Sequence, residues 1–378
     1  MNLVLSMIVK ESNTALVRRC LESVKSFIGA WAICDTGSTE AVKRAIHETL
    51  KGIPGALIDR PWVDFAHNRN ESLQLAREFD PDYFLVMDAN KELVAPGGWR
   101  FPNLTAPSYH LLLHHGKSIL PRLNVLSGRL NWKYECPIHE ILDCGEPHQS
   151  EEIPIAYLHT HGDSLRSQDP DKFVKDAKLL QELAKDKNDP HHMRYLFHLG
   201  LCCQDAGAVF ANQWDNAQAN QYRQDAIDAF ETYAAMQHKD QVQRSFANVQ
   251  IARLRESLQY GQDEVVSAYL HAYNNYPYRP EVLGYLAKYL RGKHRYHEAI
   301  FYAEIGLGLK DHPTHFIEEP EWKQWRLLDE LSLSLMHLGE VEAACGVFSQ
   351  LLNNPALPEK EQPRIIKNRE QLKQWAKV

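Results

Sequence analysis

No stretch of the sequence approaches the ~18 to 20 uninterrupted apolar residues that a membrane-spanning helix requires, so we expect no membrane span. Basic clusters are missing too: Lys and Arg are scattered through a chain of net charge −7, which disfavours strong non-specific binding to nucleic acid. The N-terminal residues MNLVLSMIVKE lack the basic leader and small-residue cleavage site of a signal peptide. We therefore expect this segment to be a core strand and the protein to be cytoplasmic.

Cysteine pairs in the CxxC spacing of zinc sites are also missing. The seven cysteines form an odd, unpatterned set, which fits neither a disulfide framework nor a structural zinc site. We expect most of them to be reduced and buried. What is present is a chain of 378 residues, 44% of them apolar, which is enough for two or three globular domains.

The first part of the chain, residues 1–167, alternates short apolar runs with helical patterns. Nearly continuous apolar runs predict strands covered on both faces; these runs span residues 3–9, 30–35, 55–59 and 83–88. Between them, apolar residues at helical spacing predict helices at 15–28, 40–52 and 68–79. The alternation of strand and helix predicts an α/β domain with a parallel sheet. Ligands bind such sheets beyond the carboxyl ends of the strands.

The second part, residues 168–378, is predicted to be all helical. Four segments share a turn, a small residue and a long helix; they are 222–236, 261–277, 294–309 and 339–355. The anchor residues Val265, Ala299 and Ala344 are separated by 34 and 45 residues, and the longer interval contains a loop at 311–325. A helix-turn-helix period of 34 residues is typical of tetratricopeptide repeats, and a bundle without repeats is the alternative. Such repeats form a concave surface suited to a partner or to dimerisation.

Asp35 lies in the segment CDTGSTE, between a predicted strand and a predicted helix. A carboxylate at this place can accept a hydrogen bond from a base or a ribose, and Gly37 lets the chain turn closely. A plainer interpretation makes Asp35 and Ser38 turn and helix-cap residues only.

In the segment FAHNRNESL, Asn68, Arg69 and Asn70 lead into the helix predicted from residue 68. A guanidinium and two amides at the positive end of a helix suit an anionic ligand. The alternative is an ordinary capped helix with a solvated Arg69.

Asp88 ends the most apolar of the predicted strands, in FLVMDANKEL, where it can offer oxygen ligands to a hard divalent cation. Asn90 offers only a neutral amide oxygen at the position where a second carboxylate would complete an acidic pair. Lys91, the next residue, can contact phosphate directly. The simpler interpretation is that this segment is the end of a buried strand.

Further candidates lie in PIHEILD and YLHTHGD, near the end of the first part. Glu140 is a candidate general base, and a histidine such as His161 is a candidate for completing a metal shell. The chain has 19 histidines, so one of them is more often a packing residue than a ligand.

These segments resemble, in order and spacing, the family 2 glycosyltransferases of the GT-A fold. The matching segments are LSMIVKE, RCLESVKSF, AICDTGSTE, FAHNRNESLQLA, FLVMDANKEL and PIHEIL, followed by the helical repeats. The most similar branch is the bacterial and phage one in which a helical repeat domain follows the catalytic domain, and it includes the peptide S-glycosyltransferases. The resemblance covers roughly the whole chain, and the ordered set is more specific than any single motif.

The resemblance implies a UDP-sugar as donor. Asp35 would bind the uracil or ribose, and Arg69 would contact the nucleotide. Asp88 and Asn90 would occupy the Asp-x-Asp motif, which holds a divalent cation and the diphosphate.

The resemblance further implies an inverting transfer of a hexose, with Mg²⁺ or Mn²⁺ as cofactor. Glu140 would deprotonate the acceptor, and Asp163 is the second candidate for this base. The acceptor would be a peptide or protein side chain, a glycan or a modified nucleobase of DNA. The cell would be bacterial or phage-infected, and the repeats would allow a homo-oligomer.

Two positions depart from the family's pattern. The chain has KES at residues 10–12 where the family usually has Lys-Asn-Glu, and Asn90 replaces the second aspartate of the motif. Asn90 motivates an alternative function, a scaffold whose glycosyltransferase domain has lost catalysis and whose helical repeats bind a partner.

Overall fold

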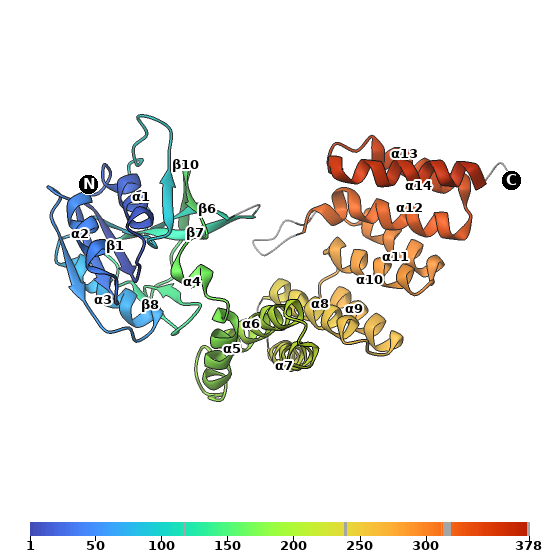
Figure 1. The fold of residues 1–378 in the computed structure, drawn as a ribbon, viewed down its shortest axis with the longest axis horizontal. Helices are drawn as coiled ribbons and strands as arrows, with labels where there is room; N and C mark the ends of the chain where they lie inside the picture. The colour runs from blue at the N-terminus through green and yellow to red at the C-terminus, as the bar shows by residue number, and fades with distance from the viewer. Residues whose placement is uncertain (116–117, 238–239, 311, 313–318, 376–378) are drawn as a thin grey trace. The chain divides into compact units, whose positions relative to one another are not determined.

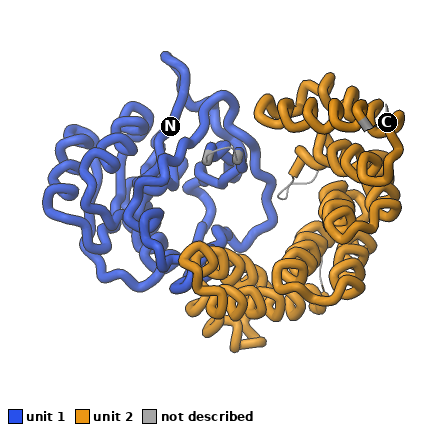
Figure 2. Tube along the Cα trace, turned by 45° about the vertical axis from the view of Figure 1, so that its right-hand side comes forward, with its two compact units in different colours: residues 1–176 blue, residues 177–378 orange. Residues whose placement is uncertain are grey.

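The computed structural model describes residues 1–115, 118–237, 240–310, 312 and 319–375 (Figure 1). The chain forms two compact units, residues 1–176 and 177–378 (Figure 2). The division lies beyond the boundary predicted between residues 167 and 168. Within the described ranges, no helix is both long enough and apolar enough to cross a membrane.

Unit 1 is built on one mixed sheet with the strand order β3-β2-β1-β4-β7-β6-β10-β5. Its strands are β1 (Leu3–Val9), β2 (Ala30–Asp35), β3 (Gly55–Asp59), β4 (Tyr83–Val86), β5 (Lys91–Val94), β6 (Ser108–His115), β7 (Ser118–Ser127) and β10 (Ser150–Thr160). A separate two-stranded sheet pairs β8 (Lys133–Glu135) with β9 (Ile141–Asp143).

The strands predicted from continuous apolar runs, β1 to β4, form the parallel half of the sheet. β1 lies between β2 and β4, and β3 pairs with the outer side of β2. Asp35 is the register partner of Val9, and Val86 is the register partner of Ser6. Asp35 and Asp88 therefore both lie at the carboxyl edge of the parallel strands, as the pattern predicts.

The expectation of a parallel sheet is wrong for the other half. β7 runs antiparallel to both β4 and β6, β5 runs antiparallel to β10, and only the pair of β6 and β10 is parallel. β6 and β7 are consecutive strands, and the end of one, His115, is the register partner of the start of the other, Ser118. Such consecutive strands pair antiparallel because parallel neighbours need a long crossover connection.

Helices cover both faces of the parallel half. α1 (Thr14–Val24) and α2 (Glu40–Thr49) pack on one face, together with alternate β1 residues such as Leu5 and Met7. α3 (Phe65–Arg77) packs on the opposite face, with Val4 and Phe84. A strand covered on both sides has no polar face, which is why β1, β2 and β4 are almost wholly buried.

The described residues of unit 2 form helices joined by short connections. Before them, α4 (Leu165–Gln168) lies in unit 1, and α5 (Lys172–Leu183) spans the division between the two units. The helices of unit 2 after α5 are α6 (His192–Asn212), α7 (Asn216–Ala235), α8 (Gln241–Ser257), α9 (Gln262–Asn275), α10 (Pro280–Gly292), α11 (Tyr296–Gly308), α12 (Leu327–Leu338), α13 (Val341–Leu352) and α14 (Gln362–Trp375). A π-helical turn, Trp322–Arg326, leads into α12. Each helix from α6 to α14 packs against the next one along the chain.

The predicted repeat segments correspond to α7, α9, α11 and α13. Their anchor residues Val265, Ala299 and Ala344 are fully buried, as expected where a small side chain lets a neighbouring helix approach. Of the predicted loop 311–325, residues 311 and 313–318 lie outside the described residues.

Candidate functional site

Asp35 ends β2 and is 1% exposed. Its Oδ1 accepts hydrogen bonds from the backbone N–H groups of Gly37 and Ser38, both at 2.7 Å, which closes the turn into α2. Gly37 has φ +121°, a conformation that favours glycine. The other oxygen, Oδ2, is buried and has no partner within the described part of the chain. Asp35 thus acts as the predicted turn residue and still has one acceptor available for a ligand.

Four predicted residues meet in one ion-pair cluster, which we call the Arg69 cluster: Arg69, Asp88, Lys91 and Glu140. The Arg69 guanidinium donates from Nη2 to Asp88 Oδ1 and from Nε to Glu140 Oε1, both at 2.6 Å. Lys91 Nζ lies 2.6 Å from the other oxygen of Asp88. The cluster joins α3, the segment after β4, the start of β5 and the segment before β9.

Arg69 is held inside α3 rather than at its end. The sequence predicts a helix from residue 68, but α3 begins at Phe65, and Asp64 caps it by accepting a hydrogen bond from His67 N at 2.7 Å. Asn68 N is already bonded to Asp64 O. The expected anion site made of free N–H groups at residues 68–70 is therefore wrong, because those groups lie past the capped first turn. What remains for a ligand is the guanidinium itself.

Asn70 and Tyr134 hold the β8 segment against α3. Asn70 Oδ1 accepts from Tyr134 N at 2.7 Å, and Asn70 Nδ2 donates to Tyr134 O at 2.8 Å. The Arg69 guanidinium lies 5.5 Å from the centre of the Tyr134 ring. One turn of α3 therefore fixes both the arginine and the strand that precedes Glu140.

The charges of the Arg69 cluster shift its pKa values strongly. Burial alone would raise the pKa of Asp88, but the positive charges of Arg69 and Lys91 outweigh burial and hold that pKa far below its usual range. For Arg69, burial works to lower the pKa, and the charges of Asp88 and Glu140 raise it instead. Burial also raises the pKa of Tyr134, so its hydroxyl is uncharged at neutral pH. The ion pair of Arg69 and Asp88 is thus fully formed at neutral pH.

The residues predicted to hold a divalent cation do not form a favourable donor set. Both carboxylate oxygens of Asp88 already accept from cationic groups. The Asn90 side chain makes no hydrogen bond to the described part of the chain and adds no charge. His161 Nε2 lies 2.8 Å from Glu92 Oε2 and is engaged there. One neutralised carboxylate and one amide fit Mg²⁺ or Mn²⁺ poorly, because both ions select oxygen ligands with negative charge.

Asp163, the second candidate base, lies in a different pair. Its Oδ2 accepts from Arg19 Nη2 of α1 at 2.8 Å, and its Oδ1 is buried without a partner among the described residues. Glu11, just past β1, is 7% exposed and also has one oxygen without a partner in the same part of the chain. Burial raises the pKa of Glu11; the backbone amide of Leu165 opposes this, and the nearby charge of Asp163 adds to it.

Sequence reasoning missed Arg19, Glu11 and Tyr134 as members of the site region. The only signal for Glu11 is the unusual KES segment, where the family pattern has an asparagine. Arg19 reads as an ordinary polar residue of an amphipathic helix, and no spacing connects it with Asp163, 144 residues away. Tyr134 lies in a strand of three residues, too short to be predicted from its pattern.

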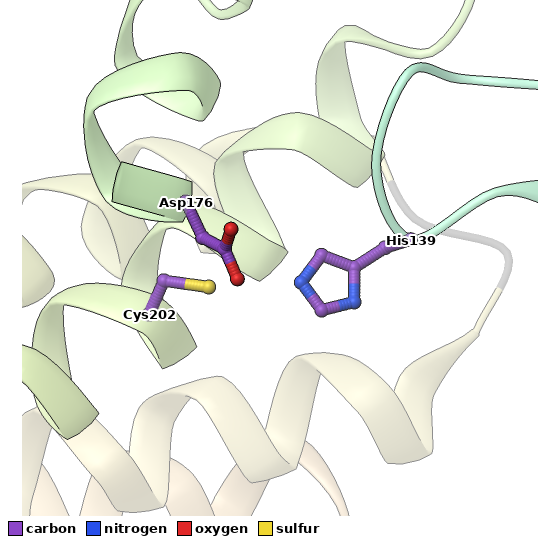
Figure 3. A group of neighbouring side chains, drawn as sticks. All are labelled: His139, Asp176 and Cys202. Atoms are coloured by element: carbon purple, nitrogen blue, oxygen red, sulfur yellow. The ribbon is translucent and has the colours of Figure 1, made fainter. Parts of the chain in front are cut away.

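One further group of polar side chains is not part of this site. Figure 3 shows His139, Asp176 and Cys202, and Asp176 accepts two hydrogen bonds from Arg166, at 2.9 and 2.7 Å. We assign no metal site to these three side chains because they come from both units. All seven cysteines are reduced, outside any disulfide, and six are buried, as predicted. Burial raises the pKa of Cys20, whose sulfur lies 3.6 Å from Asp88 O, to about 12, so this thiol is not a nucleophile.

No protein-family model and no curated protein sequence matches the chain. Among solved structures, the chain is similar to MamA, with 14% identity over 51% of this chain and 94% of that one and a TM-score of 0.36. It is similar to a tetratricopeptide repeat protein from Parabacteroides merdae, with 15% identity over 54% of this chain and 67% of that one and a TM-score of 0.37. It is also similar to BtubC from P. vanneervenii, with 13% identity over 57% of this chain and 85% of that one and a TM-score of 0.41. Similarity at this level carries no information about activity.

Proposed function

We propose that unit 1 is a GT-A glycosyltransferase domain that transfers a hexose from a UDP-sugar to an acceptor with inversion. The observation that carries the proposal is the Arg69 cluster. Three residues picked from separate motifs, Arg69, Asp88 and Glu140, are joined by two hydrogen bonds of 2.6 Å at the carboxyl edge of the parallel strands. This edge is where open α/β sheets bind ligands.

The donor nucleotide is assigned to Asp35 and Arg69. Asp35 Oδ2 is a buried acceptor without a partner among the described residues, and a base N–H or a ribose hydroxyl would satisfy it. Arg69 has N–H groups beyond those that its two carboxylates occupy, and a guanidinium pairs well with phosphate oxygens. These two residues therefore recognise opposite ends of the nucleotide.

The transfer is a single displacement at the anomeric carbon. The Glu140 carboxylate takes the proton of the acceptor group, which forms a bond to the anomeric carbon while the bond from that carbon to the diphosphate breaks and UDP leaves. Arg69 orients Glu140 through the hydrogen bond from its Nε. Asp163 is the second candidate base, and its free Oδ1 offers an acceptor in the same way. A peptide or protein side chain, a glycan or a modified nucleobase is the acceptor class.

Titration calorimetry with UDP, UDP-glucose and UDP-N-acetylglucosamine tests the proposal. We expect binding of UDP by the full chain, and a loss of about tenfold or more in affinity for Asp35→Asn, which replaces one of the two acceptor oxygens by an amide N–H₂. Asp59→Asn is the matched control, because Asp59 is the exposed register partner of Asp35 on β3. If no uridine nucleotide binds with or without Mn²⁺, the proposal fails.

A specific observation favours a second candidate, the catalytically impaired scaffold, because Asn90 leaves the motif with a single carboxylate. Intact-mass spectrometry of candidate acceptors after incubation with UDP-sugars separates the two functions. Sugar transfer by the natural chain supports the enzyme. Transfer by Asn90→Asp alone supports the scaffold.

A further inference from the structure

The segment Asp88–Lys91 already has the net charge that a two-carboxylate motif reaches only after it binds a divalent cation. Two carboxylates carry −2, and a bound Mg²⁺ or Mn²⁺ brings the sum to zero. Here Asn90 contributes no charge, and Lys91 Nζ, 2.6 Å from Asp88 Oδ2, cancels the charge of Asp88. The positive charge of Lys91 thus replaces the charge that a bound cation would supply.

The geometry of Lys91 supports this role. Its side chain is 17% exposed, so it is held in the site without being sealed from a ligand. An ammonium group has three N–H donors, and Asp88 needs only one of them. Arg69 approaches the opposite oxygen of Asp88 at 2.6 Å and is 15% exposed. Asp88 therefore holds two cations side by side, each with donors left for phosphate oxygens.

A divalent cation would meet a clear disadvantage at the same place. To bind Asp88 it must displace short, charge-assisted hydrogen bonds from Arg69 and Lys91, which are among the stronger kinds in proteins. From the predicted motif it gains the neutral oxygen of Asn90 in return, while His161 is engaged by Glu92 at 2.8 Å. The positive charges of Arg69 and Lys91 also repel it.

We propose that Lys91 and Arg69 together bind the diphosphate of the donor through their remaining N–H donors, so that the chain binds the free nucleotide rather than its metal complex. This inference rests on the proposed function, because it concerns the same nucleotide site. The site then binds a nucleoside diphosphate that carries no metal ion. The divalent cation implied by the resemblance is then not required for binding.

Calorimetric titration of UDP into the full chain, once with EDTA and once with MnCl₂, tests the inference. We expect the two dissociation constants to agree within about threefold, because Lys91 and Arg69 provide the charge in both cases. Binding that is about tenfold or more weaker in EDTA would overturn the inference and leave the proposed function intact. An absence of UDP binding under both conditions would overturn the proposed function and this inference with it.

Two variants locate the effect. Lys91→Gln keeps a hydrogen-bonding side chain of similar reach and removes the charge, so we expect UDP affinity in EDTA to fall about tenfold. Lys91→Arg keeps the charge and should retain most of the affinity. Lys25→Gln, at a half-buried lysine that ends α1 and is paired with Glu22, is the control and should change nothing. Equal affinities for Lys91→Gln and the natural chain, both folded by circular dichroism, would contradict the role of Lys91.

Asn90→Asp provides an independent test in the opposite direction. The added carboxylate would repel the diphosphate in EDTA and offer Mn²⁺ a second charged ligand. We expect this variant to bind UDP more weakly than the natural chain in EDTA and to regain affinity with MnCl₂. A natural chain that responds to MnCl₂ as strongly as Asn90→Asp would overturn the inference.

Discussion

The side chain of Asn70 exchanges two hydrogen bonds with the backbone of Tyr134, accepting at 2.7 Å and donating at 2.8 Å. An asparagine amide can do this because it carries a donor and an acceptor in one plane, as a peptide group does. Asn70 therefore pairs with β8 much as a neighbouring strand would. The pairing ties α3 to the segment that leads to Glu140.

Asn70→Ala should destabilise unit 1 by about 2 kcal/mol, because it leaves the N–H and C=O of Tyr134 without partners. Urea unfolding measures the loss, and hydrogen exchange at the Tyr134 amide should accelerate well beyond the global effect. Asn103→Ala, at an exposed position, is the control and should stay within about 0.5 kcal/mol of the natural chain. Unchanged exchange at Tyr134 would show that the pairing does not hold β8.

Arg69→Gln should cost about 3 kcal/mol at pH 7, because it leaves two partly buried carboxylates without their shared cation. The cost should depend on pH. The pKa of Asp88 in the folded protein lies below its unfolded value, so its stabilisation is present above about pH 4 and is lost as the pH falls further. The difference between Arg69→Gln and the natural chain should therefore narrow below pH 4.

Denaturant unfolding of both proteins between pH 3 and 8 checks this prediction. Arg44→Gln serves as the matched control, since Arg44 is an exposed arginine of α2 and its substitution should have little effect at any pH. A penalty for Arg69→Gln that stays constant down to pH 3 would mean that the ion pair with Asp88 contributes nothing to stability.

The parallel half of the sheet was predictable, because strands covered on both faces have continuous apolar sequences. The antiparallel half was not. β5 is four residues long, β7 contains Pro121, and β10 contains Pro154 and a register shift between Glu152 and Tyr157. Proline removes a ladder hydrogen bond and a bulge breaks the alternation, so neither strand shows a regular pattern.

The site was predictable in its members and not in its contacts. Asp88 and Arg69 could be placed at the sheet edge because one ends a strand and the other begins a helix pattern. The bridge from Arg69 to Glu140 joins residues 71 apart in the sequence, and no local spacing reports such a contact. The start of α3 was missed because Asp64, four residues before the start of the predicted helix, is the residue that caps it.

Glu11→Gln should make the protein more stable than the natural chain at pH 8 and not at pH 4. The pKa of Glu11 is raised by burial and further by the charge of Asp163, which is paired with Arg19. A raised pKa means that the protonated form stabilises the fold, and this stabilisation is lost as the pH rises through the folded-state pKa. A glutamine stays neutral and escapes that loss.

Thermal melts of both proteins from pH 4 to 8 measure the effect, which should appear as a Tm difference that grows with pH. Glu146→Gln is the control, because Glu146 is exposed and its substitution should shift the melting curve equally at every pH. A Tm difference for Glu11→Gln that does not depend on pH would show that the Glu11 carboxyl does not titrate in this way.

Two glycines of α10 allow a matched test of packing in unit 2. A Cβ on Gly284 would lie 2.2 Å from the ring of Trp322, whereas a Cβ on Gly292 would meet nothing within 4 Å. Trp322 is 2% exposed, so its ring cannot move aside freely. Gly284→Ala should therefore cost about 2 kcal/mol through overpacking. Gly292→Ala should be neutral or stabilise by up to about 0.5 kcal/mol, because alanine loses less backbone entropy on folding. Urea unfolding followed by tryptophan fluorescence measures both, and equal stabilities for the two variants would mean that the close packing of Trp322 on α10 does not exist in solution.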